Sequence, residues 1–205
     1  MSKNSSANSL KRFLLIRTDR IGDTILTLPA VTALRSQYQD AFIAFLAQPY
    51  TVPLIEQYVG IDISLSYEPH GRHKGWQGLS KLSHELQELN FDAALLFYPR
   101  VKLAFAIARA GIPVRIGTGF RWYSFLLTER IFEHRKDCQK HEAEYNFSLL
   151  ESLLPDKNPQ PQYKFKQWLP EPWWEDFRTV LNSKDYVIVH PGYGASAPNL
   201  NNEQY

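Results

Sequence analysis

The 205-residue sequence lacks the features that define several protein classes. It has one cysteine, Cys138, which excludes an internal disulfide framework and is typical of a reducing compartment. No run approaches the roughly 20 apolar residues of a membrane-spanning helix. Neither sign of charge dominates, and a net charge of +2 is too small to indicate nucleic-acid binding. We expect a cytoplasmic globular protein whose weakly basic surface suits anionic substrates or the inner face of the cytoplasmic membrane.

The ends of the sequence differ in composition from its middle. The first ten residues are rich in Ser and Asn and lack the apolar core of a signal peptide, so we expect a disordered tail at 1–10. Pro155 to Pro161 contain three prolines and four polar residues, which predicts a linker at 156–161. We therefore place a first domain at 11–155 and the start of a second, incomplete domain at 162–205.

The stretch from Arg12 to Arg35 predicts the opening unit of an α/β fold. The apolar run Phe13–Ile16 is typical of a strand buried on both faces. A polar turn at 18–23 follows, and apolar residues then recur at helical spacing from Ile25 to Tyr38. This pattern favours a doubly wound parallel sheet, in which the turn lies at the carboxyl end of a strand, where such sheets bind ligands.

Asp23, at the end of this turn, has two interpretations. It could cap the following helix, accepting backbone N–H bonds at the positive end of the helix dipole. It could instead be a general base, exposed over a crevice because Gly22 lets the backbone approach a ligand closely. The spacing alone leaves both open.

Further strands and helices alternate along the chain, as a parallel sheet requires. Strands are predicted at 41–46, 61–67, 91–97 and 114–117, and helices at 51–59, 79–90, 101–110 and 140–150. In the second unit we expect a helix at 171–181, a strand at 186–189 and a Gly-rich turn at 190–196. Such a turn offers backbone N–H groups to a phosphate.

Three other segments leave alternatives open. The basic loop 69–75 is either a solvated connector or a contact to phosphate or sugar. Trp122 and Tyr123 could stack on a sugar or cover the end of the core. His141 and Glu142 could bind a substrate or belong to a structural hydrogen-bond network.

The string RTDRIGDTILTLPAVTALR resembles the N-terminal signature of family-nine glycosyltransferases, the ADP-heptose:lipopolysaccharide heptosyltransferases and their relatives. Arg17, Thr18, Gly22, Asp23 and the run 27–29 match it. Five further segments also fit the family pattern. They are residues 91–92, 108–111 and 115–117, the helix bearing His141, Glu142 and Asn146, and the HPG segment at 190–192.

The resemblance implies the GT-B fold of two Rossmann-like domains and transfer of a heptose or related sugar from a nucleotide diphosphate sugar to a lipopolysaccharide core-type acceptor. It makes Asp23 the catalytic base and requires neither a metal nor another cofactor. We expect a monomer. The acceptor-binding residues would be Arg20, Gly22, Arg100, Arg121, His141 and Glu142. The donor-binding residues would be His190, Gly192, Gly194 and Ser196.

The sequence departs from the family pattern at two places. Tyr98-Pro99 stands where a polar pair such as Gln-Gly is usual, and Pro198 replaces a basic residue expected to hold the diphosphate. The first departure touches the acceptor side and leaves the identity of the acceptor open. Pro198 and the incomplete second domain favour an alternative, a truncated and non-catalytic acceptor-binding module of the same fold. A nicotinamide-dependent dehydrogenase is disfavoured, because no G-x-G-x-x-G follows the first strand and no acid ends the second.

Overall fold

The computed structural model of the chain describes residues 10–133, 140–154 and 162–166, which lie within one compact unit, Met1–Gln167. The predicted tail (but for Leu10), the linker, Cys138 and the secondary-structure elements expected in the second domain lie outside the described residues. Residues 162–166 pack against the rest of this unit: Phe165 forms an antiparallel bridge with Tyr58, and their rings meet edge-on at 5.1 Å between centroids. The predicted domain boundaries stay a prediction.

The centre of the unit is a six-stranded sheet in which every neighbouring pair is parallel. The strands are β1 (Arg12–Ile16), β2 (Phe42–Ala47), β3 (Ile63–Ser66), β4 (Ala93–Leu96), β5 (Val114–Thr118) and β6 (Glu129–Ile131). Their order is β3-β2-β1-β4-β5-β6. The order reverses between β1 and β4, so the loops after these two strands separate there and leave a crevice for a ligand.

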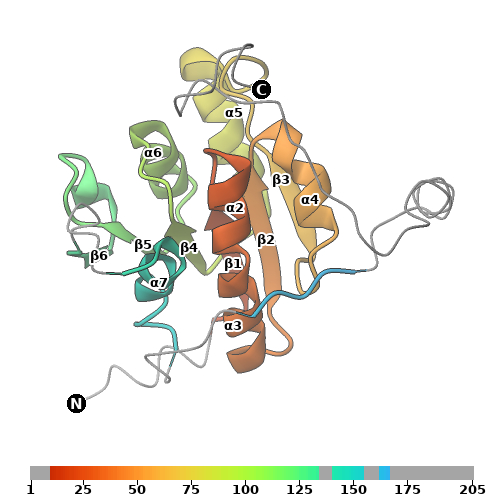
Figure 1. Ribbon diagram of the computed structural model, residues 1–205. Helices are drawn as coiled ribbons and strands as arrows, with labels where there is room; N and C mark the ends of the chain where they lie inside the picture. Colours follow the sequence, from red (N-terminus) through yellow and green to blue (C-terminus); the bar gives the residue numbers. More distant parts are fainter. Residues whose placement is uncertain (1–9, 134–139, 155–161, 167–205) are drawn as a thin grey trace, which may run out of the picture. The chain divides into compact units, whose positions relative to one another are not determined.

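Helices cover both faces of the sheet (Figure 1). On one face lie α2 (Ile21–Thr27), α3 (Pro29–Gln37), α4 (Val52–Glu56) and α7 (Glu142–Ser148), and on the other α5 (Gly75–Glu88) and α6 (Val101–Arg109). Each face of the sheet has its own hydrophobic core. Along β1, Phe13 and Leu15 pack into the core beneath α3 and α4, and Leu14 and Ile16 pack into the core beneath α5 and α6. All four side chains are without solvent exposure. Burial on both faces explains why this strand reads as a continuous apolar run.

The helix predicted from Ile25 to Tyr38 is two helices in the structure. The first begins at Ile21, inside the predicted turn, and the second begins with Pro29 at its first position. Proline has no backbone N–H to donate, so it interrupts the hydrogen-bond ladder where it could open a new helix without cost. Short one-turn segments at Pro49–Thr51 and Ser124–Leu126 and the strand β6 had no prediction.

The other predicted elements are present with different bounds: α5 begins at Gly75, four residues before the predicted start, whereas β3, β4, α4 and α7 are shorter than predicted. The helix expected at 51–59 ends at Glu56, leaving Val59 43% exposed. Helix α6 ends as expected, with Gly111 adopting the left-handed conformation (φ +74°) just beyond Ala110. Among the described residues, none of the helices has the length and apolar character needed to cross a membrane.

Candidate functional site

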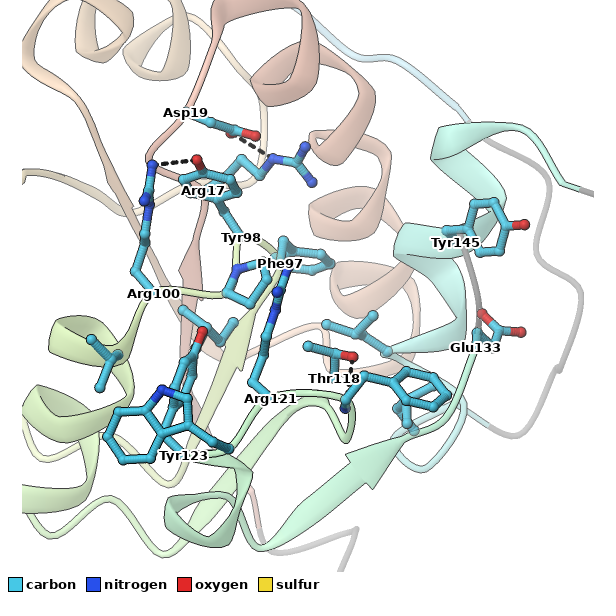
Figure 2. A pocket seen from close by; sticks show the side chains of 17 residues that line it. Arg17, Asp19, Phe97, Tyr98, Arg100, Thr118, Arg121, Tyr123, Glu133 and Tyr145 are labelled. Atoms are coloured by element: carbon cyan, nitrogen blue, oxygen red, sulfur yellow. Dashed lines mark hydrogen bonds and ion pairs between the residues drawn. The ribbon is translucent and has the colours of Figure 1, made fainter. Parts of the chain in front are cut away.

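A cavity of about 900 Å³ opens at the carboxyl end of the sheet, on the β4–β5–β6 side of the point where the strand order reverses (Figure 2). Its size is in the range of small-molecule sites. Four loops or strand ends and helix α7 supply the lining. The lining residues are Arg17 and Asp19 after β1, residues 96–101 at the end of β4, Thr118 and residues 120–123 after β5, Ile131 and Glu133 of and after β6, and Tyr145 and Leu149.

Arg17, the first residue after β1, is the centre of a buried ionic cluster. Its side chain is 3% exposed, and its Nε donates to Asp19 Oδ1 at 2.7 Å. Its Nη2 pairs with Asp23 Oδ1 at 3.0 Å, and its Nη1 pairs with Glu142 Oε1 at 3.3 Å. One guanidinium therefore holds three carboxylates, which a planar group with five N–H donors can do. We call these residues, with Asn146, the Arg17 cluster.

Asn146 connects the cluster to two helices. Its Oδ1 accepts from Arg17 Nη1 at 3.3 Å, while its Nδ2 donates to the carbonyl of Leu26 at 3.0 Å and to Thr27 Oγ1 at 3.1 Å. The amide is buried, so each of these bonds replaces one that water would otherwise make. Helix α7 is thereby tied to α2 and to the end of β1.

Asp23 lies in the first turn of α2, two residues after the helix begins. The N-cap is Arg20, with no side-chain capping bond, so the interpretation of Asp23 as the N-cap is wrong. The helix starts earlier than predicted, which places Asp23 inside it. Its side chain is 33% exposed and still faces the positive end of the helix. The carboxylate is held by Arg17 yet reachable from solvent.

Gly22 lies within α2 rather than in a turn, so the predicted glycine turn is wrong. Its backbone does not adopt the left-handed conformation, and a Cβ built on it meets no atom within 4 Å. No local contact in the structure requires a glycine there. The space in front of Gly22 and beside Asp23 is open.

Asp19 differs from Asp23 in burial, with a side chain only 12% exposed. Burial raises the pKa of its carboxyl above the usual value, although the bond and charge of Arg17 act in the opposite direction. The neighbouring charge of Asp23 adds to the increase in pKa. Asp19 also lines the cavity. Asp19 and Asp23, which differ in exposure, are thus both bound to the guanidinium of Arg17.

Two cationic side chains line the cavity from other loops. Arg100 donates to the hydroxyl of Tyr98 and lies over its ring, 4.5 Å from the centroid. Arg121 extends from the loop after β5 (Figure 2). Trp122 beside it is 79% exposed, whereas Tyr123 is 6% exposed and belongs to the core. Tyr123 thus covers the core while also lining the cavity, the Trp122 ring lies exposed beside it, and stacking of either ring on a sugar stays a prediction.

The other predicted acceptor residues do not line the cavity. Arg20 is exposed at the start of α2. His141 is the N-cap of α7: its Nδ1 accepts from the N–H of Ala143 at 3.3 Å, and its own N–H donates to Glu144 at 2.6 Å. Glu142 reaches Arg17 instead of the cavity. The structural network considered for His141 and Glu142 is therefore present, and their roles toward an acceptor stay predictions.

The basic loop 69–75 does not line the cavity. Its His73 is buried, accepting at Nδ1 from the N–H of Glu68 at 3.0 Å and bonding through Nε2 to Glu85 at 3.1 Å. The ring also stacks on Tyr67. Burial lowers the pKa of His73, against the opposing effect of Glu85. This histidine supports the fold, an outcome that neither interpretation of the loop anticipated.

Arg17 matches the sequence motif, but its role as the centre of the cluster was not predicted. A usable signal was present: an arginine directly after four apolar strand residues must be buried, and a buried charge needs partners. Its partner Glu142 is 125 residues away in the sequence, so local spacing could not identify it. The donor-binding residues predicted at 190–196 lie outside the described residues, as does Pro198.

Fold and site together define a Rossmann-like domain of the kind found in GT-B glycosyltransferases, with its cavity at the carboxyl end of a 3-2-1-4-5-6 sheet. A family-nine glycosyltransferase from Veillonella parvula superimposes on 83% of the chain with a TM-score of 0.71 and 20% identity. The ADP-heptose lipopolysaccharide heptosyltransferase II of E. coli superimposes on 82% with a TM-score of 0.62 and 22% identity. The E. coli heptosyltransferase WaaC, solved with ADP, superimposes on 74% with a TM-score of 0.61 and 20% identity.

Sequence comparison points the same way. A protein of Haemophilus influenzae, provisionally named a glycosyltransferase, is 26% identical over 208 residues, covering 96% of this chain. No protein-family profile matches the chain. The resemblance to family-nine glycosyltransferases and the predicted α/β fold are confirmed. The chain spans 58% of the length of the Haemophilus protein and about half of each solved structure.

Within residues 10–133, 140–154 and 162–166, no three His, Cys, Asp or Glu side chains are placed to hold a metal ion. The three carboxylates of the Arg17 cluster are bound to its guanidinium.

Proposed function

We propose that this chain supplies the acceptor-binding domain and the general base of a glycosyltransferase. The enzyme would move a heptose or related sugar from a nucleotide diphosphate sugar to a hydroxyl of a lipopolysaccharide core-type acceptor. The observation that carries the proposal is the position of Asp23. Its carboxylate is one-third exposed, lies at the carboxyl end of the sheet and is held at 3.0 Å by a buried arginine that also lines the cavity.

The chemistry asked of Asp23 is removal of one proton. The acceptor oxygen attacks the anomeric carbon while the bond from that carbon to the diphosphate oxygen breaks. The acceptor proton passes to the Asp23 carboxylate, and the nucleoside diphosphate leaves with the electrons of the broken bond. The Arg17 guanidinium, paired with Asp23 at 3.0 Å, and the first turn of α2 orient the carboxylate before it accepts the proton. The scheme uses no metal and no further cofactor.

The cavity supports an acceptor that is a sugar bearing negative charge. Arg100 and Arg121 contribute cationic donors, and Tyr98 and Trp122 contribute rings, a combination that suits sugar faces together with carboxylate or phosphate groups. WaaC has been solved with ADP and with ADP-2-deoxy-2-fluoro heptose, so an ADP-activated heptose is the donor we propose. Residues His190, Gly192, Gly194 and Ser196 are proposed to meet that donor.

A second function, acceptor binding without transfer, has specific support. Pro198 occupies a position where a basic residue would hold the diphosphate, and Tyr98-Pro99 replaces the usual polar pair. A module of this kind would keep the cavity and lose the donor. It would bind the acceptor in the same place.

Incubating the protein, as its gene encodes it, with ADP-heptose and a truncated lipopolysaccharide acceptor separates the two functions. We expect release of ADP and an acceptor heavier by one heptose. Acceptor binding without product, while a known heptosyltransferase is active under the same conditions, would establish the binding module instead. Neither binding nor transfer would reject both.

A further inference from the structure

The half of the sheet that contains β4 and β5 belongs to an unusual stretch of sequence. From Ala93 to Thr128 there is no aspartate or glutamate, although the whole chain carries 21. The same stretch has five basic residues: Arg100, Lys102, Arg109, Arg115 and Arg121. The net charge of +2 for the chain therefore hides a strongly cationic segment.

Helix α6, in the middle of this stretch, presents a mixed outer face. Its inner residues Leu103, Ala104 and Ile107 are fully buried against the sheet. Its exposed residues are Val101, Lys102, Phe105 and Arg109, which alternate apolar and basic character at helical spacing. Phe105, at 38% exposure, is an apolar ring on a face that solvent would normally make polar.

Aromatic residues from neighbouring elements extend this face. Trp76, at the start of α5, is 80% exposed, and its ring meets the Phe105 ring edge-on at 6.3 Å between centroids. Phe125, in the short helical turn that packs on α6, is 64% exposed. We call the exposed residues Trp76, Val101, Lys102, Phe105, Arg109 and Phe125 the α6 surface.

The α6 surface continues to the mouth of the cavity. Val101 lines both, and the cavity is also lined by exposed Trp122 and by Arg100 and Arg121. An object bound on the α6 surface would therefore lie beside the cavity opening.

We infer that the α6 surface docks the protein on an anionic lipid bilayer. Exposed tryptophan and phenylalanine next to lysine and arginine are the combination that inserts rings at the lipid headgroup level while the cations meet acidic lipids. All members of the α6 surface except Trp76 lie in the stretch of 36 positions without an acidic residue, and Lys102 and Arg109 give the surface the charge complementary to such a bilayer. Docking in this orientation would hold the cavity mouth at the membrane, within reach of a lipid-linked substrate.

The test is cosedimentation of the full chain with vesicles of phosphatidylcholine mixed with phosphatidylglycerol and with vesicles of phosphatidylcholine alone. We expect binding to the anionic vesicles that weakens as salt is raised, because exposed charges are screened. Each of Lys102→Gln and Arg109→Gln should weaken partitioning roughly fivefold, the value of one basic residue near an anionic surface. Trp76→Ser with Phe105→Ser should weaken it by roughly tenfold or more through lost apolar burial.

Matched controls change similar side chains outside the α6 surface. Lys11→Gln removes an exposed cation before β1, and Tyr163→Ser removes an exposed aromatic ring from the segment that pairs with Tyr58 at the end of α4. Both should bind vesicles as the unaltered protein does. Circular dichroism melting of every variant verifies that the fold is kept.

Three results would overturn the inference. The first is no binding by the full chain, and the second is equal binding by the α6 and control variants. The third is a dimer in sedimentation equilibrium that Trp76→Ser with Phe105→Ser dissociates, since the surface would then join two copies. The vesicle readout needs no sugar transfer, so loss of the proposed enzymatic function would leave it standing, and the converse also holds.

Discussion

At the scale of single residues, Arg17 holds the side chains of the site together, although the sequence motif draws attention to Asp23. A guanidinium that is 3% exposed joins the end of β1, the first turn of α2 and helix α7 through three carboxylates and one amide. Removing one partner from a buried ionic group leaves the others uncompensated. The carboxylate proposed to be catalytic is therefore also part of the fold.

We predict that Arg17→Met destabilises the protein by about 3–5 kcal/mol, the cost of breaking a buried ion pair from one side. Arg17→Lys should cost less, because it keeps the charge but cannot serve all of the carboxylates at once. Urea unfolding followed by circular dichroism gives both values. A loss below about 1 kcal/mol for Arg17→Met, the worth of an exposed pair, would contradict the buried cluster.

His73 makes stability depend on pH. The N–H of Glu68 donates to Nδ1, so protonation of that nitrogen would break the bond, and burial already lowers the pKa of His73 in the folded state. The unfolded chain then binds the proton more readily than the folded chain. Stability is therefore complete above the ordinary histidine pKa of about 6.5 and falls as the pH drops below it.

Thermal melts between pH 8 and pH 5.5 test this prediction. The unaltered protein should melt at a lower temperature as the pH falls through this range, and His73→Gln should show a smaller change. His70→Gln, which alters an exposed histidine of the same loop, is the control and should retain the full change. An identical pH response in all three proteins would show that His73 does not carry the effect.

At the scale of elements, the packing around each glycine shows whether a side chain would fit there, which the sequence alone does not show. Gly78 in α5 lies against the backbone of His73, where an added Cβ would be 2.1 Å from the carbonyl carbon. Gly22 in α2 faces open space. Helix α5 can approach the loop before it only because residue 78 has no side chain.

Gly78→Ala should destabilise the protein by about 1–3 kcal/mol through overpacking, despite the better helix propensity of alanine. Gly22→Ala should leave stability unchanged or raise it by up to about 1 kcal/mol, since alanine favours the helix and meets no atom. If the proposed acceptor approaches Gly22, Gly22→Ala should also raise the KM for the acceptor. Equal stability of the two variants would contradict the packing of α5 on His73.

The elements that could be predicted are those whose signal is local. The apolar runs of β1 and β4 and the glycine after α6 specify their positions without reference to the rest of the chain. The break at Pro29 was missed because apolar periodicity continues across it, although proline chemistry alone was sufficient to predict it. Strand β6 is three residues long, too short for any periodicity to show.

The site was predictable only in part. Asp23, Arg100 and Arg121 could be placed at the carboxyl ends of strands, because the α/β pattern determines which loops share that edge. The Arg17 cluster depends on contacts between residues more than 100 positions apart, which local patterns do not encode. Capping of α7 by His141 and burial of His73 are likewise consequences of packing.

At the scale of the whole molecule, the described unit would supply the acceptor side of the proposed two-substrate reaction. It contains the cavity at the sheet edge, the cationic side chains and the proposed base. The residues proposed to meet the donor follow in the sequence at 190–196. The central claim is that this unit takes part in catalysis through Asp23 and does more than hold an acceptor.

The measurement that tests this claim most directly compares the transfer rates of Asp23→Asn and Asp19→Asn in the protein as its gene encodes it. Both changes remove one carboxylate charge from the same guanidinium, so Asp19→Asn controls for the loss of that charge from the cluster. We predict that Asp23→Asn lowers kcat roughly 10²- to 10⁴-fold with acceptor binding retained, while Asp19→Asn costs much less. Equal rates for the two variants, with both folded, would contradict the assignment of Asp23 as the base.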